Sequence, residues 1–104
     1  MISTHVLDAS LGLPAADVPV TLTTPDGVEH MAATDGDGRV RELVAELRTG
    51  RHELRFDTAA YFAATGQQGF YPEVLIVFEV AEGRDHYHVP LLLAPYAYST
   101  YRGS

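Results

Sequence analysis

An alternation of apolar with small or polar side chains runs through Val18-Pro19-Val20-Thr21-Leu22-Thr23-Thr24. This period of two is typical of a β-strand with one buried face. The next residues, Pro25-Asp26-Gly27, carry the signal of a tight turn, and residues 28–34 are predicted to form the returning strand. A second turn is predicted at Asp35-Gly36-Asp37-Gly38. This region therefore predicts short strands that are joined by tight turns.

The same pattern recurs in the rest of the chain. Further strands are predicted at residues 2–8, 51–57, 74–80 and 86–93. In the second of these, His52, Leu54 and Phe56 share one face. The third is almost wholly apolar, which is expected of a strand in the centre of a sheet. About seven or eight strands, with a turn roughly every ten residues, predict an all-β fold of the sandwich type.

One segment, residues 58–66, breaks the period of two. It is rich in alanine, with Asp57 or Thr58 placed to cap its start and Gly66 placed to cap its end. We therefore predict a single short helix of about two turns. No internal repeat or linker divides the sequence, so residues 1–104 are expected to form one domain.

The composition excludes several classes of protein. Asp and Glu number 14 against 7 Lys and Arg, so the formal net charge is −7, and neither nucleic acid nor an anionic membrane is an expected partner. The absence of cysteine excludes disulfides, a thiolate nucleophile and a thiolate zinc site. No apolar run approaches the roughly 18 residues of a membrane span, and no targeting segment is recognisable. The cytoplasm is the simplest expected compartment.

A few histidines and one arginine are candidates for chemistry. His86 and His88 are two residues apart on a predicted strand, so their side chains leave the same face. No acidic residue with ligand spacing accompanies them, and no metal site is predicted. His5 lies in the first strand on the face of Ser3, and Arg39 closes the second turn. Histidine with arginine suits the hydrolysis of an amide-like bond by an activated water, although each of these residues alone is more often structural or solvated.

The tail of the sequence, residues 95–104, is unusual because tyrosine recurs at Tyr96, Tyr98 and Tyr101. A segment that frays is usually small and polar, so we expect this one to pack against other residues. Gly103 is expected to let the backbone bend tightly. Because the apolar alternation ends at Leu93, the tail is predicted to form a wall of a ligand site rather than part of the core.

Several motifs together resemble the transthyretin-like family. In chain order they are Ser3-Thr4-His5-Val6-Leu7-Asp8, Gly12-Leu13-Pro14-Ala15, Thr34-Asp35-Gly36-Asp37-Gly38-Arg39, Phe70-Tyr71-Pro72-Glu73 and His86-Tyr87-His88-Val89-Pro90-Leu91-Leu92-Leu93. The ending Tyr101-Arg102-Gly103-Ser104 is similar to that of the 5-hydroxyisourate hydrolases, and the thyroid-hormone carriers of the same fold lack it. The resemblance runs over essentially the whole chain. Ala94 and Ala97 depart from it, at positions where the family has other small residues.

The resemblance implies a two-sheet transthyretin-like β-sandwich of about seven to eight strands with one short helix. It implies a homotetramer, built as a dimer of dimers, with active sites in the channel between the dimers. The implied reaction is hydrolysis of 5-hydroxyisourate to 2-oxo-4-hydroxy-4-carboxy-5-ureidoimidazoline in urate catabolism, without a metal or a cofactor.

The resemblance also implies roles for individual residues. His5 and His88 match the catalytic histidines and Arg39 the catalytic arginine, while His5, Arg39, Tyr101 and Ser104 match substrate-binding positions. Either histidine could be the general base, and we favour His88 because its strand leads directly into the tail. The other histidines gain no comparable role: His30, His52 and His86.

Two other functions fit parts of the sequence. One is a carrier of a small apolar or aromatic ligand in the same channel, for which a pocket containing His5, Arg39 and His88 is too polar. The other is a plain sandwich used for contact with proteins, which leaves the terminal tetrapeptide unexplained.

Overall fold

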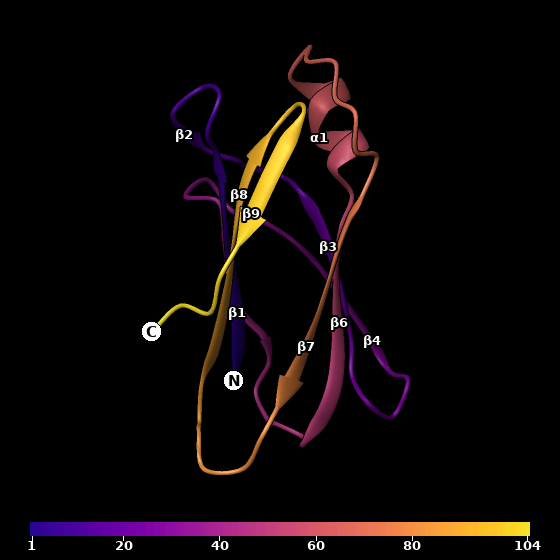
Figure 1. Cartoon of the computed structure of the whole chain (residues 1–104), viewed down its shortest axis with the longest axis vertical. Coiled ribbons are helices and arrows are strands. Elements are labelled where there is room, and N and C mark those ends of the chain that lie inside the picture. Colours follow the sequence, from indigo (N-terminus) through magenta and orange to yellow (C-terminus); the bar gives the residue numbers. More distant parts are fainter.

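The computed structural model describes residues 1–104 as two packed β-sheets with one short helix (Figure 1). In chain order the elements are β1 (Ile2–Asp8), β2 (Leu13–Pro14), β3 (Pro19–Thr23), β4 (Glu29–Ala33), β5 (Arg39–Val44), β6 (Gly50–Phe56), α1 (Thr58–Ala64), β7 (Val74–Val80), β8 (Tyr87–Ala94) and β9 (Ala97–Thr100). The predicted all-β sandwich with one helix is confirmed. The structure has nine strands where seven or eight were predicted, and three of them, β2, β5 and β9, were not assigned residues from the sequence.

β1 is the strand that organises the first sheet, whose order is β2-β1-β8-β9 with β5 also paired to β1. It runs parallel to β8 along its whole length, from Ile2 opposite Tyr87 to Asp8 opposite Leu93. On its other side it runs antiparallel to β5 and then to β2. The second sheet is antiparallel throughout, in the order β4-β3-β6-β7.

The core lies between the inner faces of the two sheets. Alternate residues of β1 and β8 point into it, and Ile2, Val6 and Leu91 are completely buried. On β6 the predicted inward face is confirmed, since His52, Leu54 and Phe56 are fully buried. The imidazole of His52 stacks on Phe78 at a ring-centroid distance of 5.4 Å, which is the structural role expected of it.

The prediction that residues 74–80 form a central strand is wrong in position, although the bounds of β7 match it. β7 lies at the edge of its sheet, next to β6 only. Its burial alternates, with Leu75 46% and Val77 47% exposed. An apolar run predicted burial on both faces, but in this chain one face of the strand stays uncovered.

The helix α1 follows β6 and begins as predicted. The carboxylate of Asp57 accepts a hydrogen bond from the Ala60 amide at 3.1 Å, which caps the first turn. Tyr61 and Phe62 are buried against the sandwich. No helix in the chain has the length and apolar character needed to cross a membrane.

Asp8, at the end of β1, is a buried carboxylate that ties this strand to the helix. Its two oxygens accept hydrogen bonds from the Tyr61 hydroxyl at 2.7 Å, the Gln67 amide at 2.9 Å and the Ser10 hydroxyl at 2.7 Å. The Leu11 amide adds a bond at 3.0 Å. Burial alone would raise the pKa of Asp8, but these bonds outweigh it and lower the pKa to about 2.

This network makes a prediction about acid stability. Because the pKa of Asp8 is lower in the folded protein than in the unfolded chain, its carboxylate adds about 2 kcal/mol to the free energy of unfolding. This contribution is complete above the unfolded-state pKa of 3.8 and disappears as the pH falls toward 2. The free energy of unfolding of the wild type should therefore exceed that of Asp8→Asn above pH 4, and the difference should shrink between pH 4 and pH 2. Denaturant titrations across this range measure it. A difference that does not change with pH would contradict the role given to the carboxylate.

Candidate functional site

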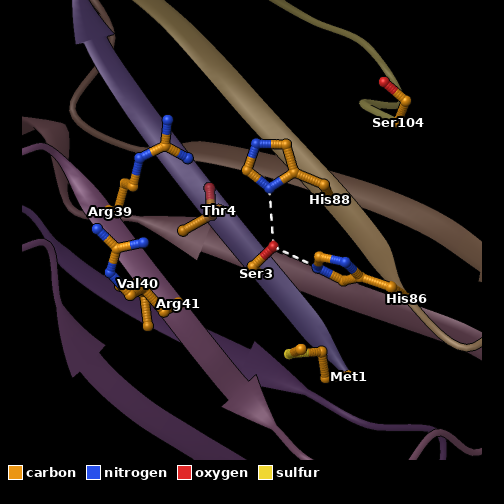
Figure 2. Close-up of a pocket in the computed structure, with 9 residues that line it drawn as sticks. All are labelled: Met1, Ser3, Thr4, Arg39, Val40, Arg41, His86, His88 and Ser104. Carbon is orange, nitrogen blue, oxygen red and sulfur yellow. Dashed lines mark hydrogen bonds between the residues drawn. The ribbon is translucent and has the colours of Figure 1, made fainter.

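The pairing of β1 with its two neighbours brings the predicted catalytic residues together on the outer face of the first sheet. His5 of β1 lies directly opposite Arg39 of β5. On the other side of β1, Ser3 lies opposite His88 of β8. Side chains that are opposite each other in neighbouring strands point to the same face. Figure 2 shows Arg39 and His88 on either side of the β1 strand at this face.

Arg39 is held at the start of β5 by the turn that precedes it. One carboxylate oxygen of Asp35 accepts hydrogen bonds from the amides of Asp37 and Arg39, both at 2.9 Å. These bonds lower the pKa of Asp35, with the bond from the Arg39 amide as the largest cause. Gly38 has a φ of +76°, and a Cβ there would lie 2.4 Å from the carbonyl oxygen of Val6. Only glycine fits this close approach to β1, which sets the position of the arginine that follows.

His5 contacts the same turn. Its Nε2 atom lies 2.9 Å from the carbonyl oxygen of Asp37. Because a carbonyl oxygen can only accept, Nε2 carries the proton and donates it in this bond. His5 therefore links β1 to the turn that carries Arg39, in addition to standing beside the arginine.

His88 is half-buried on β8, and its surroundings favour the neutral ring. Its Nδ1 atom lies 2.8 Å from the hydroxyl oxygen of Ser3. Burial lowers the pKa of His88 below its usual value, and the positive charges of Arg39, His86 and His5 act in the same direction. The Nε2 atom is the ring nitrogen that does not take part in the bond to Ser3. Near neutral pH this atom can accept a proton from water.

The tail packs on His88 through Gly103. The prediction that Gly103 is needed for a tight bend of the backbone is wrong. The Gly103 amide donates to the carbonyl oxygen of His88 at 2.8 Å. A Cβ at position 103 would lie 2.6 Å from Cδ2 and 3.2 Å from Cγ of the His88 ring. The backbone of Gly103 has no positive φ. The glycine is therefore required by its contact with the imidazole, and a tight bend is not the cause.

Arg39, His88 and Ser104 line one open cavity of about 480 Å³. The complete lining is mostly polar, and its only apolar members are Met1 and Val40: Met1, Ser3, Thr4, Arg39, Val40, Arg41, His86, His88 and Ser104. Figure 2 shows Arg39 and Arg41 on one side of β1, His86 and His88 on the other, and Ser104 on the tail. The histidine-and-arginine site expected from the sequence is thus a polar pocket with a positive group in it.

Two of the predicted site residues do not line this pocket. His5 stands next to Arg39 on the sheet but outside the lining. Tyr101 is 60% exposed and lines a separate cavity together with Ile76 and Phe78 of the second sheet. No group of three or more histidine, aspartate or glutamate side chains is close enough to hold a metal ion.

Several residues that line the pocket were not predicted from the sequence, among them Ser3, Arg41 and His86. The spacing of His86 and His88 did indicate a shared face. The hydroxyl of Ser3 contacts both rings, and this contact depends on the register between β1 and β8, which are more than 80 residues apart in sequence. Arg41 forms an exposed ion pair with Asp37 at 3.8 Å.

The fold and the pocket define a transthyretin-like sandwich with a polar site on one sheet, and a family model described as "HIUase/Transthyretin family" matches residues 2–103. The chain belongs to this family. It is 45% identical over 99% of its length to the uric acid degradation bifunctional protein TTL of Arabidopsis thaliana, of which it spans only 37%. It is 41% identical to the 5-hydroxyisourate hydrolase of Caulobacter vibrioides, over 99% of this chain and 97% of that protein.

Solved structures with this fold include both an enzyme and a hormone-binding protein. The 5-hydroxyisourate hydrolase of Klebsiella pneumoniae matches with a TM-score of 0.90 and 40% identity, covering 99% of this chain and 97% of that one. Sea bream transthyretin, solved in complex with thyroxine, matches with a TM-score of 0.88 and 32% identity, covering 98% and 93%. The fold alone therefore does not distinguish hydrolysis from thyroxine binding. The chemistry of the pocket is what can distinguish them.

The contact between Gly103 and His88 can be tested by substitution. Gly103→Ala should displace the imidazole or lift the tail, because the added methyl group would overlap the ring. The histidine Cε1–H resonance of His88 in an NMR spectrum should shift. Gly36→Ala is the matched control, since a Cβ at that position meets nothing within 4 Å. An unchanged His88 resonance in Gly103→Ala would contradict the contact.

Proposed function

We propose that this chain hydrolyses 5-hydroxyisourate, opening its six-membered ring in urate catabolism. The observation that carries the proposal is a polar pocket in which a neutral histidine and an arginine face each other across one strand. Membership of the family and the 5-hydroxyisourate hydrolases among its relatives support this substrate. A carrier of an apolar ligand is not favoured, because the pocket lining is mostly charged or polar.

Arg39 is proposed to bind the substrate and stabilise charge. The substrate is a flat cyclic imide, and its carbonyl oxygens accept hydrogen bonds in one plane. A guanidinium offers parallel N–H donors that match such oxygens. When water attacks a ring carbonyl, negative charge develops on the oxygen, and a fixed donor of this kind contributes about 3 kcal/mol in a dry site.

His88 is proposed as the general base. It accepts a proton from water at Nε2 while the water oxygen bonds to the carbonyl carbon. The C–N bond of the ring then breaks, and the departing nitrogen takes the proton from His88 Nε2, which restores the neutral base. His5 is less suited to this step, because its Nε2 atom is committed to the carbonyl of Asp37. We propose that His5 binds substrate beside Arg39 and holds the turn in place.

The tail and a homotetramer complete the proposal. Ser104 lines the pocket, and Tyr101 does not, so a substrate contact by Tyr101 requires a second copy of the chain. Each sheet ends in a strand without an outer partner, β7 in one and β9 in the other, and Leu75 and Val77 of β7 are exposed. These edges support assembly as a dimer of dimers. Light scattering that gave a single subunit at micromolar concentration would contradict it.

An absorbance assay on freshly generated 5-hydroxyisourate, compared with its spontaneous decay, tests the proposed activity. The wild type should accelerate the decay, and His5→Ala, Arg39→Ala and His88→Ala should each lose at least about 100-fold in rate. His30→Ala is the control, because His30 lies on β4 in the other sheet, and it should stay within about threefold. Near-native turnover by His88→Ala would show that the base is another residue.

The pH dependence of kcat/KM tests the protonation state of the base. A neutral His88 is the active form, so the rate should fall as the pH drops through the His88 pKa. Because burial and the neighbouring positive charges lower that pKa, the midpoint should lie below 6.5. Circular dichroism at each pH controls for unfolding. A midpoint above 6.5, or a rate that rises as the pH falls, would contradict the assignment.

A further inference from the structure

The hydroxyl of Ser3 is shared by two histidines of the pocket. Its Oγ atom lies 2.7 Å from Nε2 of His86 and 2.8 Å from Nδ1 of His88. Figure 2 shows the two bonds as dashed lines that meet at Ser3. Ser3 is only 6% exposed, so its hydroxyl is largely shielded from competing water. The proposed reaction uses His88 but neither of the other two residues.

The number of protons restricts how this group of three can be arranged. A hydroxyl has a single hydrogen, so Ser3 can donate to one ring nitrogen and must accept from the other. If Ser3 donates to His86 Nε2, then His88 Nδ1 carries a proton and donates to Ser3. If Ser3 donates to His88 Nδ1, then His86 Nε2 carries the proton. The tautomers of the two histidines are therefore coupled through one oxygen atom.

Only the first arrangement leaves His88 able to act as a base. With a proton on Nδ1, the neutral ring has its lone pair on Nε2, the nitrogen that does not contact Ser3. In the second arrangement the neutral ring carries its proton on Nε2. Its lone pair is then on Nδ1, where it already accepts the hydrogen bond from Ser3, so the ring cannot take a proton from water. The direction of the Ser3 hydrogen bond thus decides whether the base is available.

We infer that Ser3 and His86 are positioning residues, which hold His88 in its Nδ1–H tautomer through the relay His88 Nδ1–H to Ser3 Oγ–H to His86 Nε2. This inference rests on the proposed function, in which His88 is the base. Protonation of His86 reverses the relay, because a protonated Nε2 can only donate to Ser3. The hydroxyl then turns toward His88 Nδ1 and the neutral His88 loses its free lone pair.

The relay also explains how His88 can hold the proton that it takes from water. When Nε2 gains this proton, Nδ1–H still donates to Ser3, so no hydrogen bond has to be broken or turned. The charged and titratable groups that line the pocket or act on His88 are the Met1 amino group, His5, Arg39 and Arg41. Arg39 and His5 oppose a positive charge on His88. Arg39 and His5 thus favour the neutral form of His88, and the relay determines which nitrogen of that neutral ring carries the proton.

Four variants of the full chain separate this role from a merely structural one. Ser3→Ala removes the relay and should lower kcat by at least about tenfold with KM within about threefold. Ser3→Thr keeps the hydroxyl and should recover most of that loss. His86→Gln supplies an amide oxygen that can accept from Ser3, so it should keep most of the activity. Thr49→Ala, at an exposed residue just before β6 of the other sheet, is the control and should match the wild type.

A measurement without substrate tests the tautomer directly. The ring ¹⁵N shifts of His88 in labelled wild-type protein should show a protonated Nδ1 and an unprotonated Nε2, and Ser3→Ala should move the population toward the Nε2–H form. A proton on Nε2 of neutral His88 in the wild type would overturn the inference. So would a Ser3→Ala variant with unchanged kcat and shifts. If the wild type fails to hydrolyse 5-hydroxyisourate, the proposed function fails, and the ¹⁵N shifts still decide whether the relay exists.

Discussion

The parallel pairing of β1 with β8 is the constraint on which the site depends. It fixes Ser3 beside His88, while the antiparallel pairing on the other side fixes His5 beside Arg39. The register is enforced from the opposite face, because Ile2 and Val6 are completely buried. A slip of one residue would turn these apolar side chains to solvent and the polar ones into the core. Core packing therefore holds the geometry of the pocket.

The chemistry lies on the face that the core does not use. A sandwich covers only the inner side of each sheet, so the outer face of β1, β5 and β8 is free to carry polar side chains. Arg39 places a positive charge on this face of a chain whose net charge is −7. In the proposed function, this charge attracts the electron-rich ring of the substrate. Burial, together with this positive group, lowers the pKa of His88 and so favours its neutral form. In the proposed reaction, this one arrangement serves both substrate binding and the supply of a base.

The sequence predicted local features well and long-range ones poorly, for physical reasons. Local patterns of apolar residues predicted the bounds of β1 and β7, and the Asp57 cap predicted the start of α1, because these signals lie within a few residues. The edge position of β7 and the contact of Gly103 with His88 depend on which segments become neighbours in space, which no local period encodes. The link from His86 through Ser3 was missed for the same reason. Family resemblance supplied the candidate residues, while the structure supplied their contacts.

The most direct test of the account is a crystal structure of the protein with urate, a planar bicyclic imide that this hydrolysis cannot consume. We expect urate on the outer face of the first sheet, with its oxygens in hydrogen-bond contact with the Arg39 guanidinium and its ring within reach of His88 Nε2. Urate bound elsewhere, for example in the cavity beside Ile76 and Tyr101, without contact to Arg39 or His88, would contradict it.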